Sequence, residues 1–304
     1  MTAPDTPRLA PLGHRGVDRS ASDRSDPGLL AAARQDATTR VLVVSGDRAP
    51  LGSEDRLCWV SPAEAPHDGE WAFLGRDVAG AVLLLCALSA DAGDVFPAPA
   101  GWASLRASGG VLVPEDSARF VESVSLGGWL RDARFCSFCG VLTDVLDGGW
   151  SRRCPGCGRL HFPRTDPAVI VAVTHPDDPD RLLLGSNAAW APERYSCFAG
   201  FVEAGESLEG AVIRELGEEA GVQVRGIRYH GSQAWPYPRS LMVGFFAEAE
   251  DAFQARADGE EIVDVRWFSR ADIGAALAGD GDIILPGAAS IAHMLITDWF
   301  EDRA

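Results

Sequence analysis

The chain has 304 residues, 46% of them hydrophobic, and a formal net charge of −17 at pH 7. This length suffices for two domains with a small third element, and the apolar content is enough to build packed cores. The acidic balance excludes a protein that grips nucleic acid through a broad basic surface. Any contact with RNA would have to be local.

The segment from residue 1 to about 28 is rich in Asp, Arg, Ser, Pro and Ala without periodicity, which predicts a poorly ordered segment. The N-terminus lacks the apolar core of a signal peptide, and the longest apolar run, 78–90, is too short to span a bilayer as a helix. We therefore expect a cytoplasmic protein without a membrane-spanning segment. In such a chain, metal binding explains clustered cysteines better than a disulfide framework does.

The N-terminal third, 1–130, predicts a mainly β domain without a catalytic pattern of side chains. Turn residues separate the expected elements, which are a short helix, three strands and a closing helix over 29–34, 40–45, 71–74, 80–88 and about 116–124. We expect the isolated Cys58 and Cys86 to be small core residues.

Two Cys-x-x-Cys pairs mark the next segment, 131–163. They are separated by fourteen residues and consist of Cys136, Cys139, Cys154 and Cys157. Each pair can offer two thiolates on a tight turn that the following glycine permits, and tetrahedral zinc takes four such ligands. Because cysteine fills all four positions, the site is closed, and a structural zinc ribbon is expected. A redox Cys-x-x-Cys pair would explain one pair but not two.

The remaining segment, 164–304, alternates strands with helices, which predicts a mixed sheet between helices. The expected strands cover 168–173, 181–184, 196–199, 222–229, 241–247 and 262–267, and two late helices cover 271–278 and 289–300.

A further helix over 208–220 carries an unusual stripe. Ser207 is a natural N-cap and Gly221 a natural stop. At 100° per residue, the apolar side chains that begin the stripe are followed on the same face by three carboxylates, Glu215, Glu218 and Glu219. Like charges at this spacing repel, so a cation is expected beside them, and Mg²⁺ suits oxygen ligands. A solvated acidic helix face is the alternative reading of the glutamates alone.

The residues around the stripe complete the pattern G-x5-E-x7-R-E-U-x-E-E-x-G-U, where U is a bulky aliphatic residue. It begins at Gly200 and includes Glu206 and Arg214. This pattern resembles the signature box of the Nudix hydrolases, which cleave the pyrophosphate of a nucleoside diphosphate joined to another group. The resemblance implies the Nudix fold, an α/β (α+β) mixed sheet sandwiched between helices, here preceded by a zinc ribbon and a mainly β domain.

The segment Ser232-Gln-Ala-Trp-Pro-Tyr-Pro-Arg-Ser240 predicts a rigid loop, because its two prolines forbid a central strand. Trp235 and Tyr237 would then serve either to stack on a flat ring or to cap the core. The loop resembles SQPWPFPxS, the motif of the NADH pyrophosphatase (NudC-type) subgroup of Nudix hydrolases. It departs from that motif at Ala234, which replaces Pro, and at Tyr237, which replaces Phe.

The resemblance assigns the following roles. The catalytic residues would be Glu206, Arg214, Glu215, Glu218 and Glu219. The ligands of Mg²⁺ or Mn²⁺ would be Glu215, Glu218, Glu219 and Glu261, with Glu260 as the alternative if the register differs by one residue. The substrate contacts would be Ala199, Phe201, Phe162, Gln233, Trp235, Tyr237 and Ser240. The resemblance also implies that Phe162 is contributed across a homodimer interface.

The implied activity is hydrolysis of NADH or NAD⁺ to nicotinamide mononucleotide and AMP, together with removal of NAD caps from RNA 5′ ends. Two alternatives remain. One is a Nudix hydrolase for ADP-ribose or another nucleoside diphosphate derivative, and the other is a zinc-ribbon binding module with an inactive Nudix domain, against which the intact glutamates argue.

Overall fold

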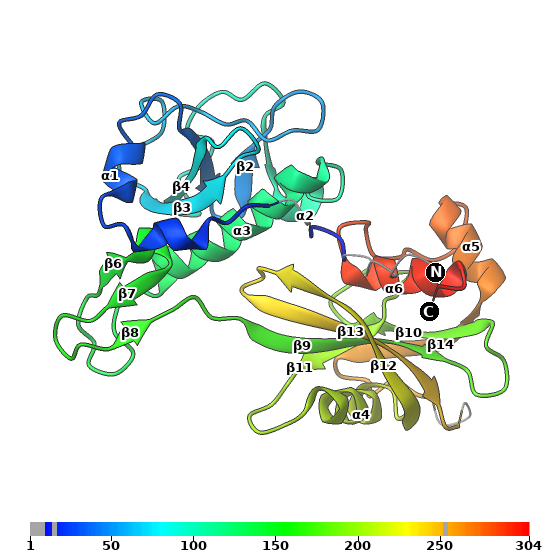
Figure 1. Cartoon of the computed structure of the whole chain (residues 1–304). Helices are drawn as coiled ribbons and strands as arrows, with labels where there is room; N and C mark the ends of the chain where they lie inside the picture. Colours follow the sequence, from blue (N-terminus) through cyan, green and yellow to red (C-terminus); the bar gives the residue numbers. More distant parts are fainter. Residues whose placement is uncertain (1–9, 14–16, 252–254, 304) are drawn as a thin grey trace, which may run out of the picture. The chain divides into compact units, whose positions relative to one another are not determined.

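The computed structural model describes residues 10–13, 17–251 and 255–303 (Figure 1). Contacts divide the chain into two units. The N-terminal unit contains 12–165 and 236–239, and the C-terminal unit contains the segments up to Pro11, 166–235 and 240–304. In the described part of the chain, no helix combines the length and the apolar character that crossing a membrane would require.

A five-stranded sheet forms the centre of the N-terminal unit. Its strand order is β3-β4-β1-β2-β5, and only β1 and β4 run parallel among these pairs. The strands are β1 (Arg40–Ser45), β2 (Arg48–Pro50), β3 (Glu70–Arg76), β4 (Val82–Leu88) and β5 (Trp102–Ser104). The short strands β2 and β5 were not predicted, since three residues are too few to give a periodic pattern.

Helices complete this unit. They are the 3-10 helix η1 (Ala21–Ser25), α1 (Leu29–Ala33), α2 (Leu105–Ser108) and α3 (Pro114–Asp132), followed by the 3-10 helix η2 (Asp147–Gly149). Helix α3 extends well beyond the predicted 116–124, because Pro114 suits the first helical turn and the apolar residues that pack on the sheet continue to Leu130.

The segment before α1 differs from the poorly ordered one that its composition predicted. Asp23 accepts two hydrogen bonds from Arg76, at 2.9 and 2.8 Å, and the Arg24 guanidinium lies 3.7 Å from the ring centre of Trp150. Ion pairs and cation–π contacts with the folded unit therefore fix a segment that has almost no apolar residues of its own. The part of the prediction that covers 1–9 and 14–16 lies outside the described residues.

The four cysteines converge as predicted. Their Sγ atoms all lie within 4.8 Å of one another, beside the three-stranded sheet β6 (Asp144–Leu146), β7 (Ser151–Arg153) and β8 (Leu160–His161). In each pair the glycine after the second cysteine, Gly140 or Gly158, has φ of 74° and donates its N–H to the carbonyl of the first cysteine. Tetrahedral zinc with bonds of about 2.3 Å separates its sulfurs by roughly 3.8 Å, so the four thiolates fit this ion.

The C-terminal unit holds a mixed sheet of six strands in the order β12-β13-β9-β10-β14, with β11 pairing to β9. Strand β13 runs parallel to β9, and the other pairs are antiparallel. The strands are β9 (Asp166–Thr174), β10 (Arg181–Asn187), β11 (Phe198–Phe201), β12 (Val224–Trp235), β13 (Ser240–Ala249) and β14 (Ile262–Ser269).

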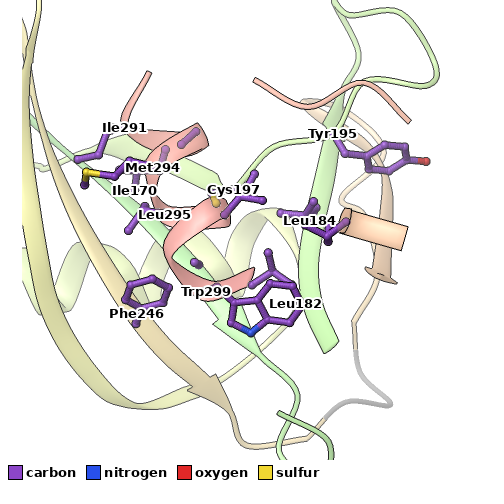
Figure 2. Packing of buried hydrophobic residues seen from close by; sticks show 14 of the residues in the cluster. Ile170, Leu182, Leu184, Tyr195, Cys197, Phe246, Ile291, Met294, Leu295 and Trp299 are labelled. Atoms are coloured by element: carbon purple, nitrogen blue, oxygen red, sulfur yellow. The ribbon is translucent and has the colours of Figure 1, made fainter. Parts of the chain in front are cut away.

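Helices cover both faces of this sheet, as the alternation of elements predicted (Figure 1). Alternate residues of β9 point to opposite faces, so Val169 and Val171 pack with α4 (Leu208–Glu219), whereas Ile170 packs with α6 (Ile291–Phe300). Figure 2 shows the second cluster, in which Trp299 of α6 lies beside Leu182 of β10. Helix α5 (Arg270–Ala278) contributes to the same side, and the burial of both faces explains the continuous apolar run of β9.

The segment 232–240 is not one loop. Strand β12 continues to Trp235, which pairs directly with Ser240 of β13, so only residues 236–239 form the turn. The prediction of a longer loop was wrong because β12 lies at the edge of its sheet, and the prolines occupy the turn rather than a hydrogen-bonded position.

We predict one tightly bound zinc ion per chain, and Cys154→Ser should lose that ion and lower the melting temperature by several degrees. The physical reason is that the binding free energy of a structural zinc is also folding free energy. Elemental analysis and thermal melting measure both effects.

Cys58→Ser is the matched control, since Cys58 lies outside the cluster. A wild-type protein without zinc, or a Cys154→Ser protein that melts like Cys58→Ser, would contradict the prediction.

Candidate active site

Helix α4 positions the acidic side chains. It begins as predicted, since Ser207 Oγ accepts a hydrogen bond from Gly210 N at 3.1 Å. Its apolar face, including Val212 and Leu216, is fully buried against the sheet. Because Glu219 continues this face one turn later, its carboxylate is directed inward and not toward solvent.

A cavity of about 400 Å³ adjoins this end of the helix. Its wall combines residues of β9, β11, β13 and α4 with one residue that follows β11 and one that precedes β14. The lining residues are Ala168, Ala199, Gly200, Phe201, Glu203, Arg214, Glu215, Glu219, Ser240, Met242 and Glu261. The cavity therefore lies entirely within the C-terminal unit.

Glu219 is the most confined carboxylate of the cluster. Only 5% of its surface is exposed, and its Oε2 atom is buried with no hydrogen-bond partner among the described residues. Burial raises the pKa of Glu219 to about 8, and the charges of Glu215 and Glu261 add to the effect. The pKa of Glu215 is raised too, chiefly by burial. Carboxylate oxygens gathered in this way, with one of them buried and without a partner, fit a hard divalent cation, for which Glu215, Glu219 and Glu261 would be ligands.

Arg214 holds the glutamates in place. Its Nε and Nη2 donate to the two carboxylate oxygens of Glu206, at 2.9 and 3.0 Å, and Nη2 also donates to the carbonyl of Phe201 at 2.9 Å. Its Nη1 lies 2.9 Å from Glu215 Oε1 and 3.0 Å from Glu218 Oε2. The expected Arg214–Glu206 ion pair is thus present, and the hydrogen bond from Arg214 lowers the pKa of Glu206.

Gly200 allows β11 to approach the helix. A Cβ atom at this position would lie 2.0 Å from the Glu215 carboxylate, far inside van der Waals contact. Any side chain here would therefore push Glu215 out of the cluster, which gives the first glycine of the sequence pattern a steric role.

Glu261, rather than Glu260, lines the cavity. The carboxylate of Asp258 accepts hydrogen bonds from the backbone N–H groups of Glu260 and Ile262, at 2.9 and 3.0 Å, and so fixes the turn that carries Glu261. Asn187 Nδ2 donates to Glu261 Oε1 at 3.4 Å. The contact from Asn187 joins segments far apart in the sequence, so a single sequence gave no local signal of it.

Two predicted catalytic residues lie beside the cavity and not on its wall. Glu206 and Glu218 both bind Arg214, and the Glu218 side chain is 62% exposed. Exposed in this way, Glu218 can reach a bound ion only from the open side of the site. The structure therefore separates it from Glu219, which sequence spacing alone could not do.

The predicted substrate residues divide into two groups. Ala199, Phe201 and Ser240 line the cavity, and Phe201 is 54% exposed, with its ring available for stacking. Sequence reasoning missed Ala168 and Met242, which are register partners on the paired strands β9 and β13. It also missed Glu203, another lining residue. A register between strands distant in sequence gives no signal in a single chain.

Four other predicted substrate residues do not line the cavity. Gln233 is buried, where its amide donates to the carbonyls of Pro11 and Ala289 and accepts from the N–H of Ile291, all at 2.8 Å. Because the Gln233 amide makes all these hydrogen bonds inside the fold, its role is structural. This finding corrects the predicted contact of Gln233 with the substrate.

The other three lie elsewhere. Trp235 ends β12 and is half-buried, Tyr237 lies in the 236–239 turn, and Phe162 follows the zinc ribbon in the N-terminal unit.

We predict that Glu219→Gln stabilises the protein when divalent cations are removed by dialysis. A carboxyl whose pKa rises from 4.5 to about 8 on folding binds a proton more tightly in the folded state. Stability therefore falls as pH rises between these values, and the variant escapes this loss. Its advantage should grow from pH 6 to pH 8 and then level off at about 1–4 kcal/mol, given about 1.4 kcal/mol per pKa unit.

Thermal melting at several pH values measures this advantage, and added Mg²⁺ should reverse it by stabilising only the wild type. If the difference in melting temperature between Glu219→Gln and the wild type were the same at pH 6 and pH 8.5, the raised pKa of Glu219 would be ruled out.

Comparisons with known proteins agree with this geometry. Residues 164–285 match the NUDIX domain family, and residues 131–162 match the NADH pyrophosphatase zinc ribbon domain. The chain is 40% identical over 310 residues to the NAD-capped RNA hydrolase NudC of Mycobacterium bovis (strain BCG / Pasteur 1173P2), covering 96% of this chain and 95% of that protein. It is 36% identical over 198 residues to the NAD-capped RNA hydrolase NUDT12 of Homo sapiens, covering 62% of this chain and 42% of that protein.

A NUDIX hydrolase structure from Nitrosomonas europaea is 28% identical, with a TM-score of 0.41, and covers 56% of this chain and 92% of that one. The predicted fold class, a Nudix fold preceded by a zinc ribbon and a mainly β region, is confirmed. With the signature glutamates at a cavity and four cysteines at one point, the chain belongs to the Nudix hydrolase family, in the group of the NudC-type NAD-capped RNA hydrolases.

Proposed function

We propose that the protein hydrolyses the pyrophosphate bond of NADH or NAD⁺ to nicotinamide mononucleotide and AMP, and removes NAD caps from RNA 5′ ends by the same bond cleavage. The observation that carries this proposal is the cavity that joins the acidic cluster to an exposed aromatic ring, Phe201. A dinucleotide offers the matching pair of features, a pyrophosphate and a flat base. The similarity to NudC over nearly the whole chain supports the same substrate class.

The reaction adds water across the P–O–P bridge, so one P–O bond forms to the water oxygen and one bridging P–O bond breaks. When bound, a divalent cation, which we propose to be Mg²⁺ or Mn²⁺, neutralises phosphate charge and acidifies water. Glu215, Glu219 and Glu261 would hold it, with Glu218 from the open side. Arg214 keeps Glu215 and Glu218 oriented through its contacts, and Glu206 fixes Arg214.

A general base must lie within hydrogen-bond reach of the attacking water. Glu219 and Glu218 are both close to the cation site, and we assign the proton transfer to Glu219 because it faces the cavity. Phe201 would hold the nicotinamide end by stacking. Ser240 and Met242 of β13 also line the cavity.

We predict that Glu219→Gln lowers the turnover of NADH by about two to four orders of magnitude, the range for loss of a general base or a metal ligand. Glu218→Gln, measured separately, should also lower turnover. The assay is release of AMP in Mg²⁺ and in Mn²⁺, with NADH, ADP-ribose and NAD-capped RNA as substrates. Glu209→Gln is the matched control, because Glu209 is exposed in the first turn of the same helix.

The outcomes separate the alternatives. A strong preference for ADP-ribose would replace the nicotinamide dinucleotide as substrate while keeping pyrophosphate hydrolysis. Wild-type turnover in Glu219→Gln would remove that residue from the mechanism. A wild-type protein without hydrolytic activity on any of the three would point to an inactive binding module.

We also propose a homodimer located in the cytoplasm. The zinc ribbon and its flanks expose many apolar side chains, and such a patch is typical of an interaction surface. These are Phe135, Phe138, Val141, Leu142, Val145, Leu146, Leu160 and Phe162, of which Phe162 is 45% exposed. The resemblance implies that a second copy of the chain covers this surface.

The proposed location in the cytoplasm rests on the four cysteines. Their reduced thiolates suit a reducing compartment, and cell fractionation tests this location.

We predict that Phe201→Ala lowers kcat/KM for NADH by one to two orders of magnitude, about 1–3 kcal/mol, the scale of one base–aromatic stack. Metal affinity should stay unchanged, since the ring is not a ligand. Tyr229→Ala removes another exposed aromatic of the same unit and should have little effect.

If the partner's Phe162 completes the stack, Phe162→Ala should give a similar loss, and light scattering should show twice the 32.3 kDa chain mass. A monomeric wild type, or Phe201→Ala with full activity, would contradict the stacking model.

A further inference from the structure

One of the three cavity carboxylates proposed to hold the cation does not belong to helix α4. The helix places Glu215 and Glu219, whereas Glu261 directly precedes β14 and lines the same cavity. Helical geometry therefore cannot set the position of Glu261 relative to the other two carboxylates. That position depends on the segment 256–262, which lies wholly within the C-terminal unit.

This segment is fixed at both ends. Arg256 donates its N–H to the carbonyl of Ala220, the C-cap of α4, at 2.9 Å. The carbonyl of Glu261 accepts a hydrogen bond from the N–H of Ala188, just after β10, also at 2.9 Å. The segment thus connects the end of the acidic helix with the end of a strand. Since both ends are fixed, the turn between them decides where the Glu261 side chain lies.

Asp258 closes this turn. Its Oδ1 atom accepts hydrogen bonds from the backbone N–H groups of Glu260 and Ile262, the two neighbours of Glu261, at 2.9 and 3.0 Å. Gly259 has φ of 82° and donates its N–H to the carbonyl of Ile262 at 2.9 Å. An Asp-Gly pair suits a turn, because the carboxylate can bond to nearby backbone N–H groups and glycine accepts positive φ without strain. One carboxylate oxygen thus holds the backbone before and after the proposed ligand.

A β-bulge lies directly after Glu261. In a regular strand Ile262 and Val265 would point to opposite faces of the sheet, since they are three residues apart. Both instead pack in the cluster that contains the apolar side chains of α4, because the pairing of β14 with β10 skips Val263. Val263 is 52% exposed, whereas Ile262 is buried. The bulge thus turns the start of β14 toward the α4 core, and Asp258 binds the N–H of the residue that the bulge redirects.

We infer that Asp258 is a positioning residue: by closing the 258–262 turn, its carboxylate holds Glu261 within reach of a divalent cation that the carboxylates of α4 also bind. This inference rests on the proposed function, because it assumes that these glutamates hold the cation. Asp258 itself is exposed and does not line the cavity. It therefore acts on cation affinity through the backbone of the turn.

The test compares two substitutions of Asp258. Asp258→Ala removes both hydrogen bonds and should weaken the binding of Mn²⁺ to the purified full chain about ten- to hundredfold, the range for loss of a group that orients a metal ligand. Asp258→Asn keeps an acceptor oxygen and removes the charge, so its affinity should stay within about threefold of the wild type. Electron paramagnetic resonance of free Mn²⁺ measures these affinities without substrate.

A double-mutant cycle shows whether the effect passes through the proposed ligand. Glu261→Gln should also weaken Mn²⁺ binding, and adding Asp258→Ala to it should cause little further loss, since both changes act on the same ligand. Asp178→Ala is the matched control. Asp178 accepts the N–H of Asp180 at 3.2 Å in another turn of the same unit and does not line the cavity, so this variant should bind Mn²⁺ like the wild type.

Hydrogen exchange supplies a readout that needs neither cation nor activity. Without added Mg²⁺ or Mn²⁺, the amides of Glu260 and Ile262 should exchange about three- to tenfold faster in Asp258→Ala than in the wild type. In Asp258→Asn they should exchange nearly as in the wild type, and the amides of α4 should be unchanged in both variants. Because Asp258 is exposed, its substitution should leave the cores intact, which the melting temperature and the zinc content check.

The outcomes separate the two levels of inference. The positioning role would be overturned if Asp258→Asn bound Mn²⁺ as weakly as Asp258→Ala, which would assign the effect to the charge alone. Wild-type affinity or wild-type exchange in Asp258→Ala, or a double variant much weaker than Glu261→Gln, would overturn it as well. A wild-type protein that does not bind Mn²⁺ would overturn both levels. One that binds Mn²⁺ but cleaves neither NADH nor NAD-capped RNA would refute only the proposed substrates.

Discussion

The site depends on keeping several carboxylates close together against their mutual repulsion. Burial of the apolar face of α4 forces Glu219 inward, and the Arg214 guanidinium offsets part of the charge from the opposite side. In the described part of the chain, Arg214 contacts Glu206, Glu215, Glu218 and the carbonyl of Phe201, and Glu219 Oε2 is left buried without a hydrogen-bond partner. The packing of α4 on the sheet therefore stabilises an arrangement of carboxylates that would otherwise repel one another.

Much of this arrangement could be predicted from sequence because it is local. The stripe on α4 follows from helical geometry over twelve residues, and the spacing of the two Cys-x-x-Cys pairs alone defines a closed zinc site. Both require only that one short segment folds in the ordinary way. Strand β9 could be predicted for a similar reason, because it is buried on both faces of the sheet and its residues 168–173 are continuously apolar.

What the sequence did not reveal depends on pairing between distant segments. Gln233 carries no mark that its partners are Pro11 and Ala289, and the prolines after Trp235 read equally well as a loop or as the turn of a long hairpin. The segment around Asp23 was misjudged for a related reason, because its order comes from ion pairs with Arg76 and not from its own composition. Contacts of this kind are visible only once the register of the sheets is known.

The alternation of β9 between two cores has a consequence for how the length of this strand can vary. A single inserted residue within β9 would turn every following side chain to the opposite face of the sheet. Residues that now pack against α4 would then face α6, and residues that now pack against α6 would face α4. It would also break the parallel register with β13 that brings Ala168 opposite Met242 at the cavity. Substitutions of similar volume can be absorbed at these positions, but a change of one residue in strand length would disrupt both cores and the cavity together.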